Sequence, residues 1–459
     1  MIYLLFWISS FVVYLYSPAE YDYAFCLTLT ILYVVMSFFF LRKSFQINSY
    51  FNFHLFFLIS FFVTNYVYPT FIYQIDPYYF SIFTYSFDHN LISRGTALAQ
   101  LGISSYMLGS VILMNNRILP DKSKDMRTYN VSTASIQITK FLFFSFTAFF
   151  LIYVFLIAPK FKDQVELNSQ IVNIEVVLFT IVLTFIILSN VDLYRNNLKL
   201  FLRQNIYLVI SVVLIILSAL WYGDRGIAIQ IFFISTYIIY NFIKKIKFTH
   251  LLVLIIIGFI TLTFISYTRG TEHNLQESAL SDAMKEGMDS FSSFESNWEF
   301  GMDLIINARN LYVGIEYAEN EEFLYGKSYF PYLFILIPGL PTYMTKATFN
   351  IEPEHIATSG IITDYSNAGW GIGTNAIADV YMNFGLPGVV FLFFIFGMLI
   401  VWLEKQNGVY SLIAYLLIFA LAIYYPRASI FEQSALVIRA LLIAFILLNL
   451  ARNKRFVLK

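Results

Sequence analysis

Five arginines stand at or near the ends of long apolar segments, where charged side chains are uncommon. They are Arg94, Arg225, Arg269, Arg427 and Arg439. An arginine in the hydrocarbon region of a bilayer costs at least ~2.5–3.5 kcal/mol at mid-depth, so it normally has a partner or a task. Arginine keeps its proton and binds phosphate through paired hydrogen bonds. These residues are therefore candidates for binding a phosphate group.

Arg225 has the most specific surroundings of the five. It lies in the sequence Gly223-Asp224-Arg225-Gly226, at the start of an apolar segment. Exposed N–H groups at the start of a helix, together with a guanidinium group, favour an anion. Two structural alternatives stay open. Asp224 can form an ion pair with Arg225 at the lipid interface, and Arg94 can extend its charged end into water without binding a substrate.

A second group of polar residues begins the apolar segment near position 375. Asn375, Asp379 and Asn383 are four residues apart, so a helix places them on one face over two turns. A carboxylate within a membrane span faces protein or water rather than lipid. These residues, with Tyr381 from the same stretch, are therefore candidates for lining a substrate site. Polar contacts between helices are the alternative.

Membrane-spanning helices must position these residues. The 459-residue chain is 59% hydrophobic and only 13% charged. Its apolar residues gather in blocks of roughly 17 or more, long enough to cross ~30 Å of hydrocarbon as helices, whereas barrel strands would need alternating segments of ~10 residues. We therefore predict an all-α, polytopic membrane helix bundle of about twelve spans. They lie near residues 2–17, 23–41, 51–73, 91–114, 138–158, 171–190, 205–222, 226–243, 250–268, 375–403, 409–425 and 433–450.

The distribution of basic residues and one long connection determine the predicted topology. One set of alternate loops, with the C-terminal tail, holds 17 Lys and Arg, against ten on the opposite side. Cytoplasmic loops are rich in Lys and Arg, so both termini should be cytoplasmic. Residues 1–268 then form nine N-terminal helices, residues 269–374 one large external loop, and residues 375–459 three further helices and a cytoplasmic tail. Within the loop, the apolar residues 328–341 are too few to span, which predicts a re-entrant or interfacial segment.

Several classes of function are disfavoured by the sequence. Net charge is zero, which gives no reason to expect a nucleic-acid partner. Cys26 is the only cysteine, and no Cys/His cluster indicates a metal site. The absence of a GxxxxGK[ST] motif and of a DxD in a loop disfavours an enzyme that uses nucleotides or nucleotide sugars. No repeat relates the two halves of the chain, which weakens an inverted-repeat transporter.

Two of the stretches described above resemble the bacterial O-antigen polymerase (Wzy) family and the related O-antigen ligases. They are Asp224-Arg225-Gly226 and the stretch from Asn375 to Gly388. The predicted spans, the cytoplasmic termini and a large external loop late in the chain agree with the family pattern. The ligases carry a His-Asn pair where this sequence has Thr374 before Asn375, so the resemblance favours a polymerase. A ligase, a flippase for lipid-linked oligosaccharide and a non-catalytic scaffold are the alternatives.

The resemblance implies a C-type glycosyltransferase-like membrane fold and a reaction that needs neither a metal nor another cofactor. It places the enzyme in the bacterial inner membrane, where it would polymerise oligosaccharide repeat units carried on undecaprenyl pyrophosphate. The growing chain would move to the incoming unit with release of undecaprenyl pyrophosphate, giving a surface polysaccharide of O-antigen or capsule type. Membrane lipid and a chain-length regulator protein are the other possible partners.

The charged residues have separate expected roles in this reaction. Pyrophosphate is already a good leaving group, so the main requirement is fixed positive charge where negative charge develops. We expect Arg225 and Arg269 to supply it, with the other three arginines as further substrate ligands. A base must also accept the proton of the attacking sugar hydroxyl. Asp379 is the first choice for this base and His355, in the external loop, is the second.

Overall fold

The computed structural model is helical throughout the part of the chain that it describes. The described residues are 1–47, 49–85, 87–115, 131–157, 169–222, 225–245, 249, 298, 301–337, 339–368, 371–406, 408–432 and 434–453. No β-strand occurs among them, which confirms the predicted all-α class. The chain forms two compact units, one of residues 1–126 with 301–439 and the other of residues 127–300 with 440–459.

Among the described residues, seven helices are long and apolar enough to cross a membrane. They are Tyr23–Gln46, Phe53–Ile72, Leu91–Met114, Thr133–Ile157, Ile171–Ser189, Gly226–Ile243 and Ala376–Lys405, and each coincides with a predicted span. Leu198–Gln204 and Ile206–Ala219 form a further candidate that is bent by 82°. Shorter apolar helices cover three more predicted spans: Ile2–Leu15, Val409–Ala420 and Ser434–Leu450. The predicted span 250–268 lies outside the described residues, so the count of twelve stays a prediction.

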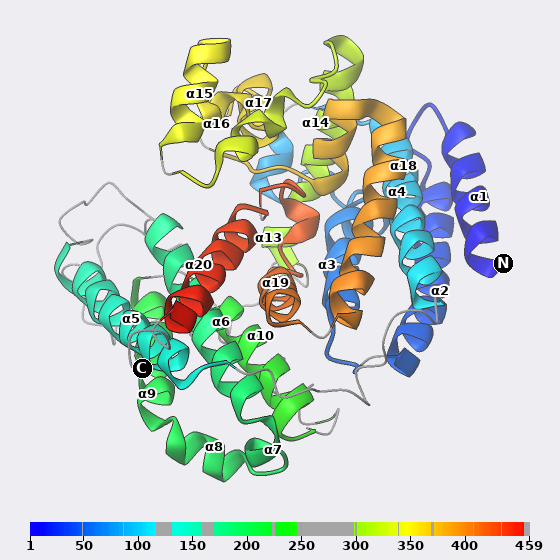
Figure 1. Cartoon of the computed structure of the whole chain (residues 1–459). Coiled ribbons are helices and arrows are strands. Elements are labelled where there is room, and N and C mark those ends of the chain that lie inside the picture. Colours follow the sequence, from blue (N-terminus) through cyan, green and yellow to red (C-terminus); the bar gives the residue numbers. More distant parts are fainter. Residues whose placement is uncertain are drawn as a thin grey trace, which may run out of the picture. The chain divides into compact units, whose positions relative to one another are not determined.

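The first unit combines helices from both ends of the chain (Figure 1). Its N-terminal part contains α1 (Ile2–Leu15), α2 (Tyr23–Ile47), α3 (Phe53–Val67), η1 (Tyr68–Ile72), η2 (Ser81–Thr84) and α4 (Leu91–Met114). Its C-terminal part contains α13 (Met302–Ile305), α14 (Asn307–Asn320), η7 (Lys327–Phe334), α15 (Leu340–Phe349), α16 (Pro353–Ile356), α17 (Thr358–Tyr365), α18 (Ala376–Lys405), α19 (Val409–Ala420) and η8 (Tyr425–Arg427). The final helix, α20 (Ser434–Asn453), begins in this unit.

Helices α4 and α18 run side by side at the centre of this unit, and glycines allow their backbones to touch (Figure 1). A Cβ atom added at Gly109 would lie 2.1 Å from the carbonyl oxygen of Phe394. One added at Gly397 would lie 2.1 Å from the carbonyl oxygen of Tyr106. Small residues permit this close approach where lipid provides no hydrophobic driving force between helices. Helix α18 is therefore held on a rigid neighbour along its length.

Helix α18 is broken near its N-terminal third, and the break fixes the loop that precedes η7. Gly385 has φ 61° and ψ −156°, a backbone conformation that favours glycine. Pro387 has no N–H group, so the carbonyl of Asn383 lacks its usual donor within the helix. The N–H of Tyr325 donates to this carbonyl at 3.0 Å, and the N–H of Leu324 donates to the carbonyl of Met382 at 2.9 Å. The break thus becomes a docking point for the segment that leads into η7.

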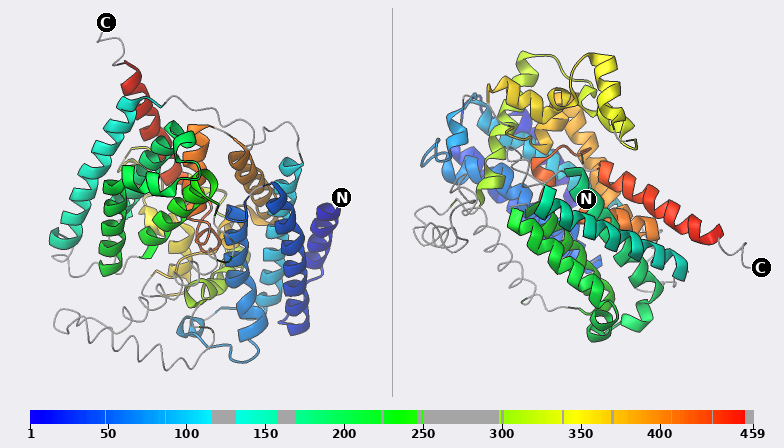
Figure 2. Two further views of the ribbon diagram at one scale, coloured as in Figure 1. Left: turned by 90° about the horizontal axis from the view of Figure 1, so that it is seen from below. Right: turned by 90° about the vertical axis from the view of Figure 1, so that its left-hand side faces the viewer.

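The second unit is a bundle of helices from the middle of the chain (Figure 2). Its elements are α5 (Thr133–Ile152), η3 (Tyr153–Ile157), α6 (Ser169–Ser189), α7 (Val191–Tyr194), α8 (Leu198–Gln204), α9 (Ile206–Tyr222), α10 (Arg225–Ile238) and η5 (Ile239–Ile243). Helix α5 packs against α6 and α9, and α10 packs against the same two helices. The buried Glu175 accepts a hydrogen bond from the Thr147 hydroxyl at 2.7 Å, which joins α6 to α5.

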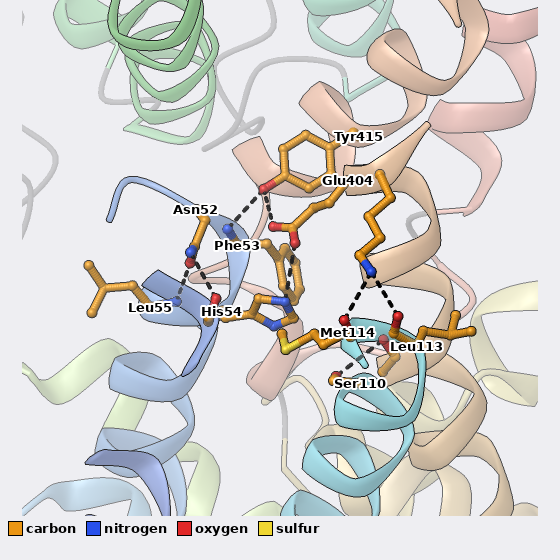
Figure 3. A network of polar contacts seen from close by, with 12 residues as sticks. Asn52, Phe53, His54, Leu55, Ser110, Leu113, Met114, Glu404 and Tyr415 are labelled. Atoms are coloured by element: carbon orange, nitrogen blue, oxygen red, sulfur yellow. Dashed lines mark hydrogen bonds and ion pairs between the residues drawn. The ribbon is translucent and has the colours of Figure 1, made fainter. Parts of the chain in front are cut away.

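A buried polar network joins four helices at the C-terminal end of α18 (Figure 3). His54 of α3 places Nε2 3.4 Å from the Glu404 carboxylate and Nδ1 2.6 Å from the Tyr106 hydroxyl of α4. Tyr415 of α19 donates to Glu404 at 2.7 Å and accepts the N–H of Phe53 at 3.1 Å. These side chains are almost completely shielded from solvent. The network therefore fastens α3, α4, α18 and α19 to one another.

Candidate functional site

The polar residues that open α18 have separate partners. Asn375 is the N-cap residue, and its side chain accepts the N–H of Ile377 at 2.9 Å. Its amide group also donates to the Asn65 side chain at 3.0 Å and to the carbonyl of Asn307 at 3.3 Å. Because the residue is completely buried, these bonds join the start of α18 to α3 and α14.

Asp379 is a fully buried carboxylate that receives hydroxyl groups from three different segments. Thr358 of α17 donates to Oδ1 at 2.7 Å. Tyr329 of η7 donates to Oδ2 at 2.8 Å, and Ser429, which follows η8, donates to the same oxygen at 2.9 Å. The N–H of Ile430 is a further donor. Four donors replace the water that a buried carboxylate loses.

Asn383, one turn further along α18, continues this contact with η7. Its side-chain oxygen accepts the N–H of Gly326 at 3.2 Å, and its amide lies 2.8 Å from the Ser328 hydroxyl. The amide also donates to the carbonyl of Asp379 at 2.7 Å. Asp379 and Asn383 therefore share the face of α18 that carries η7, as their spacing predicts.

Asp379 contributes to a cavity of about 470 Å³ between η7, α16, α17 and the segment before α20, which we call the polar cavity. Its polar and charged lining residues are Ser328, Tyr332, Glu354, His355, Thr358, Ser359, Thr363, Asp364, Thr374, Asp379, Ser429 and Glu432. Four of these carry carboxyl groups, and none of the described lining residues is Lys or Arg. Such a lining matches sugar hydroxyls, which donate hydrogen bonds to carboxylates, better than it matches a diphosphate.

His355 and Asp364 form a pair at the solvent-exposed rim of the polar cavity. The Nδ1 atom of His355 lies 2.8 Å from Oδ2 of Asp364. The hydrogen bond to Asp364, and then the negative charge of that residue, raise the pKa of His355. With Nδ1 engaged in this way, Nε2 is the ring nitrogen that can exchange a proton with a bound molecule.

Two further groups of the polar cavity have altered acidity. Much of Glu432 is exposed, yet the protein packed around its carboxyl group and the nearby Asp379 raise its pKa, while Arg427 opposes the change. Burial, followed by the charges of Glu432 and Asp379, raises the pKa of Tyr332 well above its ordinary value. Both groups therefore hold their protons more tightly than they would in water.

The three described arginines of the predicted phosphate site are dispersed over the first unit. Arg94 forms an ion pair with Glu319, and its guanidinium group also lies 3.5 Å from the Tyr381 hydroxyl. Arg427 donates to the carbonyl of Asp303 at 3.0 Å and lies over the Tyr424 ring at 4.8 Å.

Arg439 completes this set, donating to the carbonyl of Ile335 at 3.0 Å. None of the three is among the described lining residues of the polar cavity. Arg225 is the first described residue of α10, but its side chain and the whole of Arg269 lie outside the described part of the structure. The predicted diphosphate role of these two stays a prediction.

Sequence patterns missed the partners of Asp379. Tyr329, Thr358 and Ser429 are hydroxyl residues 50, 21 and 50 positions away from it. Hydroxyl residues are common in loops, and no spacing marks these three. The only available signal was Pro387, because a missing donor within a helix requires a segment from elsewhere to supply one.

Arg309 was also missed, and the structure places it in the interior of the first unit. This residue of α14 is completely buried, donates from Nε to the carbonyl of Tyr85 at 3.3 Å and lies over the rings of Tyr85 and Phe87 at 5.8 and 6.0 Å. Burial lowers its pKa to about 10, against the opposing effect of Glu316, so it stays charged at neutral pH. It contributes a fixed positive charge between α14 and the segment after η2.

Comparison with known proteins identifies the family of the chain. Residues 1–455 match the sequence model of the family described as O-antigen polysaccharide polymerase Wzy. No curated protein and no solved structure matches the chain significantly. In the described part of the structure, no group of three or more His, Cys, Asp and Glu is arranged to hold a metal ion. Because the family match covers nearly the whole chain, this membrane protein belongs to the Wzy O-antigen polymerase family and polymerises O-antigen repeat units.

Proposed function

We propose that the polar cavity binds the sugars of the incoming lipid-linked repeat unit and that His355 is the general base of the polymerisation reaction. The observation that carries this proposal is the His355–Asp364 pair at the rim of a cavity rich in carboxyl and hydroxyl groups. A carboxylate that accepts the ring N–H at Nδ1 orients the imidazole and leaves Nε2 available as the base.

His355 is better suited to this role than Asp379, which the sequence alone favoured. Asp379 is fully buried, and three hydroxyl groups and one backbone N–H use most of the lone-pair positions of its carboxylate. It has little capacity left to accept the proton of a sugar. We assign it instead to positioning, because it connects η7, α17 and the segment after η8 around the cavity.

The proposed step transfers the growing chain to the incoming unit. A hydroxyl oxygen of the incoming sugar attacks the anomeric carbon at the diphosphate end of the growing chain and forms the new glycosidic bond. The bond from this carbon to the diphosphate oxygen breaks, and undecaprenyl pyrophosphate leaves with the electron pair. The hydroxyl proton moves to Nε2 of His355 and then to water. Arg225 and Arg269 remain the proposed ligands of the leaving diphosphate, on the chemical grounds given above.

We further propose that the reaction needs no metal and occurs on the outer face of the bacterial inner membrane. A good leaving group and fixed cationic side chains are sufficient for the charge development in this step. The basic loops support cytoplasmic termini and an external loop that supplies most of the residues lining the polar cavity. Cys26 is buried, so added cysteines can test this orientation without a background signal.

The orientation test uses two exposed tyrosines. Tyr343→Cys in α15 should react with a membrane-impermeant maleimide from outside, and Tyr410→Cys at the start of α19 should react only after the membrane is opened. The reverse pattern would contradict the proposed orientation.

The catalytic test uses the purified full chain in lipid nanodiscs with a lipid-linked repeat unit, with the products separated by length on a gel. His355→Gln should abolish the ladder, whereas Glu322→Gln, an exposed loop residue that lines neither described cavity, should leave it unchanged. The chelator EDTA should have no effect. A normal ladder from His355→Gln would exclude this residue as the base.

A further inference from the structure

A second cavity, of about 380 Å³, lies along η7 and differs in chemistry from the polar cavity. We call it the aromatic pocket, because its walls are Tyr325, Tyr329, Phe330, Leu333, Phe349 and Phe384. Gly326 and Lys327 complete the described lining, and no carboxylate is among these residues. The two cavities thus differ in charge. Carboxyl groups line the polar cavity, and Lys327 is the single cation among the described lining residues of the aromatic pocket.

The two cavities share η7 as a common wall. Ser328 and Tyr332 of η7 line the polar cavity, while Phe330 and Leu333 line the aromatic pocket. Tyr329 belongs to the boundary, because it lines the aromatic pocket and its hydroxyl donates to Asp379 of the polar cavity at 2.8 Å. One side chain therefore connects an apolar site to a site for hydroxyl groups.

Several apolar side chains are exposed at and near the aromatic pocket. Leu333, Leu336 and Ile337 are 75%, 48% and 59% exposed, and Phe384, which belongs to a candidate membrane span, is 40% exposed. Exposed apolar side chains in a row normally face lipid or another apolar partner. Their position next to a span supports an opening of this pocket toward the membrane rather than toward water.

We propose that the aromatic pocket binds the first isoprene units of the lipid carrier, with the carrier's diphosphate beside Lys327 and the attached sugars in the polar cavity. The family acts on lipid-linked oligosaccharide, so a substrate carries an apolar chain, two phosphates and hydroxyl groups in this order. The same three kinds of chemistry meet at η7: an apolar pocket, the cation Lys327 in its lining, and a cavity of hydroxyl and carboxyl groups that shares the wall. This inference rests on the proposed function, because it takes the polar cavity as the sugar site.

Physical chemistry favours this occupant. Branched isoprene units remove apolar area from water when they pack on aromatic rings, at roughly 25 cal/mol per Å². Lys327 is exposed and offers three hydrogen-bond donors to phosphate oxygens. A sugar can stack on an aromatic ring, but its hydroxyl groups would meet no carboxylate among the described lining residues of this pocket, and an anion without an apolar chain would contact only Lys327.

A sugar-free probe tests the pocket independently of catalysis. The full chain in nanodiscs is labelled with farnesyl diphosphate that carries a diazirine on its isoprenoid chain, and the labelled peptide is identified by mass spectrometry. We expect labelling within residues 325–333, and undecaprenyl diphosphate should compete for it. Labelling that is confined to other peptides would overturn the proposal.

Two tryptophan variants of the same segment sharpen the test. Leu333→Trp places a larger ring at the wall of the pocket and should reduce labelling by about tenfold or more, equivalent to ~1.4 kcal/mol of binding free energy. Leu336→Trp changes an exposed leucine three residues away that does not line the pocket, and it should label normally. Equal labelling of both variants would show that the probe binds elsewhere.

The charge of Lys327 is tested by comparing two competitors. Lys327→Gln should weaken competition by unlabelled farnesyl diphosphate several-fold, while competition by farnesol should stay as in the wild type. Equal effects on both competitors would remove the diphosphate from the proposed position beside Lys327.

Failure of this inference can be distinguished from failure of the proposed function. His355→Gln should stop polymerisation and keep the labelling, because it changes the polar cavity alone. If Leu333→Trp both labels and polymerises as the wild type does, the aromatic pocket is not the lipid site, and the polar cavity is unaffected. If His355→Gln polymerises normally while labelling follows the pocket variants, the catalytic assignment is wrong and the lipid site stands.

Discussion

Asp379 and Glu404 are buried carboxylates near opposite ends of α18, and each accepts a hydrogen bond from a tyrosine. Tyr329 donates to Asp379 at 2.8 Å, and Tyr415 donates to Glu404 at 2.7 Å. The surroundings differ. The side-chain donors to Asp379 come from η7, α17 and the segment after η8, and the residue lines the polar cavity. Glu404 meets helices α3 and α19 (Figure 3), and it lines neither described cavity.

This difference shows that buried carboxylates with similar hydrogen bonds can either line a cavity or hold helices together. A carboxylate whose partners lie on tightly packed helices has no room for a ligand, so its hydrogen bonds contribute to stability. A carboxylate whose partners lie on short connecting segments can have a cavity beside it. Activity should therefore depend on residues around Asp379, and stability on residues around Glu404.

The two histidines near these carboxylates should show the largest contrast. His355→Gln removes the proposed base and should lower the polymerisation rate by about 10²–10⁴-fold with little change in thermal stability, because the side chain is exposed. His54→Gln removes a buried partner of Glu404 and Tyr106 and should lower the free energy of unfolding by about 1–3 kcal/mol. Polymerisation assays and thermal unfolding of both variants measure these effects. A rate loss in folded His54→Gln of the size expected for His355→Gln would contradict the contrast.

Substitutions of the two carboxylates should show the same contrast, with a loss of rate at Asp379 and a loss of stability at Glu404. Asp379→Asn replaces one acceptor oxygen by an NH₂ group that faces the hydroxyls of Tyr329 or Thr358, so the cavity wall should shift and the rate should fall by about tenfold or more. Glu404→Gln should lower stability by ~1–3 kcal/mol and leave the rate per folded molecule unchanged. The measurement is the polymerisation rate normalised to folded protein, together with the unfolding temperature. Equal rate losses in both variants would remove the distinction between the two ends of α18.

The sequence predicted the helices and the polar face of α18 from local information. Hydropathy identified the apolar segments, because a span must satisfy its backbone within itself and show an apolar surface to lipid. The spacing of Asp379 and Asn383 indicated a shared face, because helix geometry is the same wherever a helix forms. The break at Gly385, two residues before Pro387, also lies where the local residue types permit it.

The arrangement of the candidate site could not be predicted in this way. The hydroxyls on Asp379 come from distant positions, and their meeting depends on how η7, α17 and the segment after η8 fold over α18. Arg94 shows the same limit from the other side. Arg94 is conspicuous in an apolar segment, but it pairs with Glu319 near the C-terminal end of α14, which no local pattern connects to it. Sequence reasoning finds charges more easily than it finds their partners.

The pH dependence of the rate should depend on the contact between His355 and Asp364. A base acts in its neutral form, so the rate should rise as the pH rises through the pKa of His355. Asp364 raises this pKa by its hydrogen bond and its charge. Asp364→Asn should therefore move the acidic limb of the pH–rate profile to lower pH, and Glu354→Gln, whose effect on His355 is smaller, should move it less. A limb that stays in place in Asp364→Asn would show that another group is the base.

The smallest change in rate should come from Tyr329, whose chemical counterpart at Glu404 is Tyr415. Tyr329→Phe removes one of three hydroxyl donors from Asp379, and the other two remain, so we expect a loss of about 1 kcal/mol or less and a rate reduced by a few-fold. Tyr415→Phe removes the donor to Glu404 and also the acceptor of the Phe53 N–H, which leaves two buried groups without this partner. Its cost should be larger, ~1–3 kcal/mol, and should appear in thermal unfolding rather than in the rate. Tyr329→Phe lowering stability more than Tyr415→Phe would contradict this contrast. The contact between Tyr329 and Asp379 would then stabilise the fold in the same way as the network at Glu404.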